Sequence, residues 1–236
     1  MSKSKNSPLS RRSVLSGGLG LAGSSALMAT GASGTAHAAG SPQPSERTTA
    51  WQTSTSANGW QVTDHDGIAP HRVEGSPMTV SLRSGDTATV LLHVARRYFY
   101  EIDSELKTED ITGHSTDRAV AAAFESDYLS GTAIAIRPHA CPLGADGCLF
   151  PQDVDVIRDI LADCEGTVRW GGDEKSPKQS HFQIDVTPGD PRLARVTAKI
   201  HSWQATPGKG AGTIDAFVPQ RLRAARDLAH TQQRAA

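Results

Sequence analysis

The sequence has no excess of positive charge, no internal repeat and no long apolar segment beyond its N-terminal region. Its 236 residues include 24 lysines and arginines and 25 aspartates and glutamates, so the formal net charge at pH 7 is −1. Proteins that bind nucleic acid usually carry a basic face that neutralises phosphates. The charge balance therefore argues against nucleic acid as a partner.

The apolar run near the N-terminus is too short and too rich in glycine to span a membrane. It follows residues 10–15 (Ser-Arg-Arg-Ser-Val-Leu) and precedes residues 36–38 (Ala-His-Ala). An arginine pair, an apolar run and a small-x-small site in this order are typical of a twin-arginine signal peptide, with a disordered basic tail as the alternative. We expect removal of residues 1–38 and a mature chain without a membrane span, extracellular or associated with the cell wall.

The mature chain would have 198 residues (236 − 38) and would keep 20 of the 24 basic residues against all 25 acidic ones. Such a length suits one domain with a real hydrophobic core. We interpret residues 39–50, which are rich in Ser, Pro and Gly, as a linker, and residues 51–205 as the domain. Residues 206–236 form a basic tail, either flexible or helical.

Cysteine is scarce, with three residues in the whole chain. Cys141 and Cys148 enclose a turn-rich loop, and they are expected to form a disulfide in an oxidising compartment. Metal binding by these thiols is the weaker alternative, because no His or further Cys lies at zinc-site spacing. Cys164 lies on the apolar side of an expected helix, where it would be a small buried hydrophobe.

The hydrophobic pattern predicts an α+β fold. Residues 133–136 and 181–186 alternate in the manner of strands with one buried face, which places His181 and Gln183 on the other face. Short strands or irregular segments are expected at 51–62 and 71–82. Apolar residues recur at helical spacing near 87–103, near 152–165 and from Asp190-Pro191 onwards. The sum is a small antiparallel sheet flanked by helices.

The most specific pattern lies between residues 126 and 186. Ser126, Gly131 and Ala133 come first, residues 170–173 read Trp-Gly-Gly-Asp, and residues 181–182 read His-Phe. This frame resembles the D-alanyl-D-alanine carboxypeptidase-like zinc peptidases, a group that includes phage endolysins and the hedgehog signalling domain. The resemblance covers roughly residues 75–203. It implies a carboxypeptidase/hedgehog-like fold, a zinc ion, and peptidoglycan peptides as substrates.

The chain departs from the family at the positions that perform the chemistry. Tyr128 occupies the position of the first zinc-binding His in the motif Ser-x-His-x-x-Gly-x-Ala-x-Asp, and Ala135 occupies that of the zinc-binding Asp. Lys178 stands where the family has its general base, and only His181 matches a ligand. A catalytic zinc needs three protein ligands and an open position for water. We therefore expect no zinc, unless an alternative set of ligands exists.

Several side chains admit more than one role at this stage. His181 either lines a ligand cleft or forms hydrogen bonds on the polar face of the sheet. Tyr128 either fills the vacated metal pocket or donates its hydroxyl to a ligand. His93 and His114 are possible substitute ligands, although a surface or packing role is favoured for His93. The candidate cleft or ligand residues are Ser126, Tyr128, Ala135, Trp170, Asp173, Lys178 and His181, with His181 as a weak metal candidate.

Three hypotheses of function follow. The first is an exported protein with the peptidase scaffold but without catalysis, which binds or regulates through peptides or fragments of the cell wall. The second is a metal-dependent peptidoglycan peptidase with a non-standard site. The third is a structural extracellular domain whose tail arginines meet anionic wall polymers; these arginines are Arg221, Arg223, Arg226 and Arg234.

Overall fold

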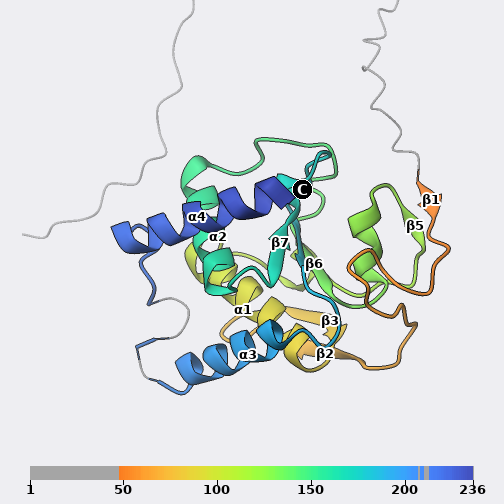
Figure 1. Ribbon diagram of the computed structural model, residues 1–236, viewed down its shortest axis with the longest axis horizontal. Helices are drawn as coiled ribbons and strands as arrows, with labels where there is room; N and C mark the ends of the chain where they lie inside the picture. The colour runs from red at the N-terminus through yellow and green to blue at the C-terminus, as the bar shows by residue number, and fades with distance from the viewer. Residues whose placement is uncertain (1–47, 207, 210–212, 236) are drawn as a thin grey trace, which may run out of the picture. The chain divides into compact units, whose positions relative to one another are not determined.

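The computed structural model describes residues 48–206, 208–209 and 213–235 (Figure 1). The expected signal peptide, and the expected linker up to residue 47, lie outside these residues. The described part is an α+β fold with small antiparallel sheets and several helices. None of its helices combines the length and the apolar character needed to cross a membrane.

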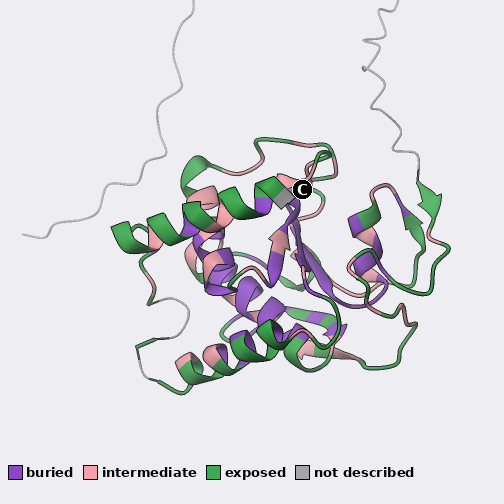
Figure 2. Cartoon of the chain, in the orientation of Figure 1, coloured by how far each residue is buried: buried purple, intermediate pink, exposed green. Residues whose placement is uncertain are grey.

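The largest sheet of the described chain has four strands, ordered β4 (Ile111–Thr112), β6 (Ala133–Ile136), β8 (His181–Ile184) and β7 (Val168–Trp170). Each neighbouring pair is antiparallel. The alternating patterns correctly predicted β6 and β8, although the expected strand 181–186 extends two residues beyond the end of β8 at Ile184. The expectation that one face of β8 is exposed was wrong, because every residue of β6 and β8 is buried (Figure 2). The second face is covered by segments far away in the sequence.

Two smaller sheets precede and flank this one. β2 (Ile68–Arg72) pairs with β3 (Thr79–Arg83), and β1 (Thr49–Ala50) pairs with β5 (Ala119–Val120). β1 consists of the last two residues of the expected linker, so the ordered domain begins before residue 51. Residues 51–62 are irregular apart from a single bridge between Thr55 and Gln61.

The three predicted helices are present as α1 (Asp86–Glu101), α2 (Pro151–Asp163) and α3 (Pro191–Gln204). α3 begins as its sequence indicates, because the Asp190 carboxylate accepts a hydrogen bond from the backbone N–H of Arg192 at 2.8 Å. α1 and α2 pack against the four-stranded sheet, and α3 packs on α1. Short 3₁₀ turns complete the described fold: η1 (Thr108–Asp110), η2 (Ala123–Tyr128) and η3 (Gly171–Asp173).

The expected tail contains a further helix, α4 (Pro219–Ala235), which lies beside α2 in Figure 1 and packs on it extensively. Gln232 is buried, and its side-chain N–H donates to the backbone carbonyl of Val168 in β7 at 2.8 Å. The expected tail therefore contains a helix, which was one of its two alternatives. This helix packs on the domain and is not separate from it. α4 contributes to the core and to the edge of the sheet.

A buried ion cluster joins α1, α2 and α4. The guanidinium of Arg97, with no exposed surface, donates to Glu101 on its own helix and to Asp159 and Asp163 on α2. Arg221 from α4 bonds the same two aspartates, Asp159 at 2.7 Å and Asp163 at 3.0 Å. Burial alone would lower the pKa of Arg97, but the hydrogen bonds and charges of the three carboxylates raise it. The cluster brings two cations together with three carboxylates, so each buried charge has a partner of opposite sign. Buried charge is tolerated under this condition.

Candidate functional site

The three positions that depart from the resembled motif, Tyr128, Ala135 and Lys178, lie together with His181 in space. The pairing of β6 with β8 sets Ala135 opposite His181. The turn η2 brings the Tyr128 hydroxyl to 2.6 Å from Nδ1 of His181, and the two rings meet edge to face. Lys178, three residues before His181, places its ammonium 5.3 Å from the centre of the Tyr128 ring. Residues separated by up to 53 positions thus form one cluster, which we call the His181 cluster.

Both ring nitrogens of His181 are engaged. Nε2 lies 2.7 Å from the amide oxygen of Gln183 and donates to it. Nδ1 then carries the lone pair, which accepts the proton of the Tyr128 hydroxyl. The ring has no exposed surface and also contacts the ring of Phe124 at 4.8 Å. Burial lowers the pKa of His181 to about 3, against the raising effect of Gln183, so the ring is neutral at physiological pH.

A half-buried ion pair covers the outer side of the cluster. Nζ of Lys178 bonds the Glu125 carboxylate at 2.6 Å, and both side chains keep only 13–15% of their surface exposed. Burial opposes the ionisation of Glu125, but the hydrogen bond and charge of Lys178 outweigh it, so the pKa of Glu125 is lowered. The backbone N–H groups of Ala121 and Ala122 also bond this carboxylate. The pair is therefore charged, and it closes the cluster on the solvent side.

The side chains of this cluster do not fit a zinc ion. The lone pair of His181 is used by Tyr128, Ala135 has no donor atom, and Lys178 contributes a positive charge where a cation would sit. Within the described residues, no group of three or more His, Cys, Asp or Glu side chains is placed to hold a metal. His114, a possible substitute ligand, has its Nε2 at 2.7 Å from the carbonyl oxygen of Thr63. The zinc that lowers the pKa of water in the family therefore lacks its ligands here.

Close packing explains the two glycines of the Trp-Gly-Gly sequence at residues 170–172. A Cβ on Gly171 would lie 2.6 Å from the carbonyl oxygen of Lys178 and 2.9 Å from Cβ of His181. A Cβ on Gly172 would lie 2.5 Å from the Trp170 ring. Glycine at both positions thus allows the turn to approach His181 and Trp170 closely. The Trp-Gly-Gly sequence therefore shapes the wall of the cluster.

The remaining sequence candidates serve as supports of the cluster. Trp170 is buried and donates its indole N–H to the carbonyl oxygen of Gln179 at 2.8 Å. Asp173 forms a two-pronged ion pair with Arg158, whose guanidinium lies 4.8 Å from the centre of the Trp170 ring. The negative charge of Asp173 is therefore balanced by Arg158 of the same chain. Ser126 is also fully buried.

A buried polar cluster around Asp127 was not predicted from the sequence. The Ser126 hydroxyl accepts from the backbone N–H of Ala57, and Oδ1 of Asp127 accepts from that of Asn58 at 3.1 Å. Oδ2 of Asp127 has no hydrogen-bond partner within the described chain, and the residue has no exposed surface. Burial raises the pKa of Asp127 to about 7, although the bonds from Asn58 and Ser56 lower it in part. No local signal reveals this site, because Asn58 lies 69 residues away.

The cysteines and His93 differ from or refine their expected roles. All three cysteines are free thiols, so the expected disulfide between Cys141 and Cys148 is not formed in this structure. Cys164 is fully buried in the core, as its position on the helix indicated. His93 is buried rather than on the surface and packs against the ring of Trp203 at 5.8 Å.

Comparisons with family models, with curated proteins and with solved structures give no match for this chain. The account of the site consequently depends on its own geometry. That geometry offers no ligand set for a metal among the described residues of the cluster. It does offer a charged pair and an aromatic ring near the surface: Glu125, Lys178 and Tyr128.

Proposed function

We propose that this protein is an exported domain of the carboxypeptidase-like type, without catalytic zinc, that binds peptides of the cell wall and acts as a binding or regulatory module. The observation that carries the proposal is the meeting of Tyr128, Ala135, Lys178 and His181 in one cluster. Four positions chosen from a family motif would not be expected to converge if the resemblance were accidental. The twin-arginine pattern supports the location, and the α+β fold is compatible with the family.

The proposal places recognition at the outer side of the His181 cluster. The family acts on peptides that end in a D-alanine carboxylate. The ammonium of Lys178 is a partner for such a carboxylate, and the face of Tyr128 is a platform for the apolar part of a peptide. Glu125 neutralises Lys178 in the free protein, so a ligand carboxylate would have to share or replace this partner. We therefore expect modest affinity and strong dependence on ionic strength.

Zinc content tests the loss of the metal. The wild-type chain, loaded with zinc and then desalted, should retain no tightly bound metal by elemental mass spectrometry. The triple variant Tyr128→His, Ala135→Asp, Lys178→Glu restores the family ligands and base, and it should retain about one zinc per chain. Tyr128→His alone is the matched control, with two ligands and weak retention. One tightly held zinc in the wild type would contradict the proposal.

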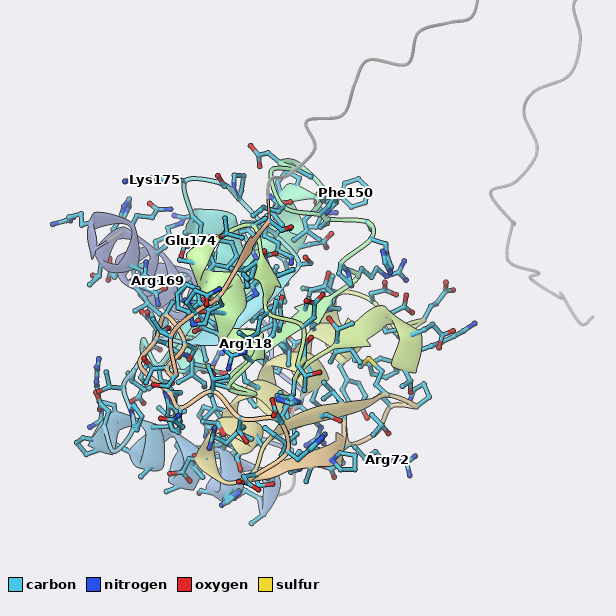
Figure 3. The ribbon with its side chains drawn as sticks, turned by 90° about the vertical axis from the view of Figure 1, so that its right-hand side faces the viewer. Arg72, Arg118, Phe150, Arg169, Glu174 and Lys175 are labelled. Atoms are coloured by element: carbon cyan, nitrogen blue, oxygen red, sulfur yellow. The ribbon has the colours of Figure 1, made fainter. Side chains whose placement is uncertain are left out.

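Wall binding tests the function itself. Purified peptidoglycan should retain the wild-type chain in a sedimentation assay, and Lys178→Ala should weaken retention about tenfold, equivalent to about 1.4 kcal/mol. Lys175→Ala is the control, because Lys175 is a fully exposed lysine on the same turn, and it projects from the surface in Figure 3. Equal retention of the two variants would exclude Lys178 as the contact. No retention of the wild type would exclude the wall as the ligand.

A further inference from the structure

A cavity separate from the His181 cluster lies where the ends of α2 and α3 meet the start of α4. Its volume is about 420 Å³, and its lining includes Asp163 at the end of α2, Trp203 in the last turn of α3, and Val218 and Arg221 at the start of α4. Val218 and its neighbour Phe217 are two of the four large apolar side chains that are exposed in the described chain. Exposed apolar surface therefore gathers at this cavity.

The lining also holds a hydrogen-bond donor and an acceptor that the described chain does not use. Arg221 bonds Asp159 and Asp163 through Nε and Nη2, which leaves Nη1 as a donor. The Asp163 carboxylate bonds Arg97 at 2.9 Å and Arg221 at 3.0 Å, in both cases through Oδ2, which leaves Oδ1 as an acceptor. A ligand group that donates to Oδ1 and accepts from Nη1 would use both atoms.

A polar atom behind the wall of the cavity also lacks a partner. His93 on α1 is 7% exposed, and its Nε2 forms no hydrogen bond within the described residues. The centre of its ring lies 5.8 Å from that of Trp203, and Nε2 lies 3.9 Å from Oδ2 of Asp163, so His93 adjoins two residues of the lining. Buried polar atoms usually have a partner, as both ring nitrogens of His181 do. The unpartnered atom indicates that a bound molecule completes the polar contacts here.

The charges around the cavity favour a neutral ligand. The buried cluster already holds three carboxylates and two guanidinium groups, those of Arg97 and Arg221. A ligand carboxylate would add a fourth negative charge beside Asp163, whereas a ligand cation would direct its donors at Nη1 of Arg221. The exposed lining residues Lys209 and Asp215 have opposite signs and add no net charge. A carboxamide avoids both conflicts, because it is neutral and carries a donor and an acceptor in one plane.

We propose that this cavity binds a flat, neutral carboxamide carried on an aromatic ring. The amide N–H donates to Oδ1 of Asp163, and the amide oxygen accepts from Nη1 of Arg221. The ring occupies the apolar part of the cavity, lined by Trp203 and Val218, because an aromatic ring packs well against an indole. This site does not depend on the proposed peptide site, with which it shares no residue.

Benzamide is the probe, and binding is followed through the indole N–H signals of the four tryptophans in NMR spectra of the full chain. The spectrum of Trp203→Phe identifies the Trp203 signal. Benzamide should shift this signal with a Kd of about 1 mM, which is a reasonable affinity for so small a ligand. Benzoate and benzamidine have nearly the same shape but carry a negative and a positive charge. Each should bind about tenfold more weakly than benzamide.

Two neighbouring substitutions locate the ligand. Val218→Asp places a carboxylate in the apolar wall and should weaken the binding of benzamide about tenfold. Phe217→Asp is the matched control, because it adds the same charge at an exposed side chain that does not line the cavity, and it should leave the affinity unchanged. Three results would overturn the proposal: no shift of the Trp203 signal, benzoate or benzamidine binding as tightly as benzamide, or equal effects of the two substitutions.

Discussion

One carboxyl group of the described fold has no exposed surface and one unpartnered oxygen. Asp127 holds residues 56–58 through Asn58, but its second oxygen, Oδ2, has no partner among the described residues. Its pKa of about 7 lies above the ordinary value, so the folded protein binds a proton that the unfolded chain releases. Its contribution to stability is therefore complete below pH 4 and is lost as the pH rises towards 7.

Asp127→Asn should abolish this loss, because the amide cannot ionise. The variant should resemble the wild type at pH 4 and should exceed its free energy of unfolding at pH 8 by up to about 4 kcal/mol, the equivalent of three pKa units. Urea unfolding at the two pH values measures the difference. Asp64→Asn, at an exposed position, is the control and should change stability by less than about 0.5 kcal/mol. A gain of the same size at pH 4 would show that ionisation is not the cause.

Among the elements, α4 has a sequence that suggests an exposed tail, but ion pairs hold it against α2. Arg221 was expected, with three other arginines, to meet anionic wall polymers, but it reaches the buried carboxylates of Asp159 and Asp163. Arg223 and Arg226 remain exposed and keep that possibility open. The outward charge of α4 is therefore smaller than its sequence suggests.

Arg221→Ala should destabilise the protein by about 1–3 kcal/mol, because it leaves three buried carboxylates with Arg97 as their only remaining cation in the described cluster. Arg223→Ala, two residues along the same helix, removes an equal charge from an exposed position and should cost less than about 0.5 kcal/mol. Denaturant unfolding compares the two. Equal effects would indicate that the change in net charge, rather than the ion cluster, determines the result.

The elements themselves could be predicted wherever their signals are local. The alternation of residues 133–136 gave β6, and Asp190-Pro191 marked the start of α3. The start of α1 carries a weaker local signal, because its N-cap is Gly85, with φ 97° and no side-chain bond. The burial of His181 could not be predicted, because alternation indicates a polar face but does not show that η2 covers it. The same holds for Asp127 and Arg221: Asn58 lies 69 residues from Asp127, and Asp159 lies 62 residues from Arg221.

For the whole molecule, acid is the main threat to the folded state. Burial is the first cause that lowers the pKa of both His93 and His181 to about 3, with nearby cations such as Arg97 adding to the shift of His93. Each ring is neutral in the folded protein but binds a proton in the unfolded chain below pH 6.5. Their contributions are therefore complete above pH 6.5 and are lost as the pH falls towards 3. Asp127 has the opposite effect between pH 4 and 7, where its contribution to stability decreases as the pH rises.

Between pH 4 and 6.5, His93 and His181 each bind a proton on unfolding, whereas Asp127 releases one. The net result should be an uptake of about one proton. The free energy of unfolding should consequently fall by about 1.4 kcal/mol per pH unit as the solution is acidified through this range. Asp127→Asn should make the slope about twice as steep, since the opposing group is gone. Urea unfolding at half-unit steps of pH measures the slopes. A slope that is flat in both proteins would contradict the burial of neutral histidines.

The Arg97 cluster draws its charges from three helices, and the last of them is made by the ribosome after every other described element. Until Arg221 emerges, α1 and α2 present three carboxylates with Arg97 as their only cation in the described cluster, and the β7 edge that Gln232 will cover is still open. The nascent chain should therefore hold a loosened form, and its packing should be complete only after α4 has been made. α4 is thus the last described element on which the packing of the folded chain depends.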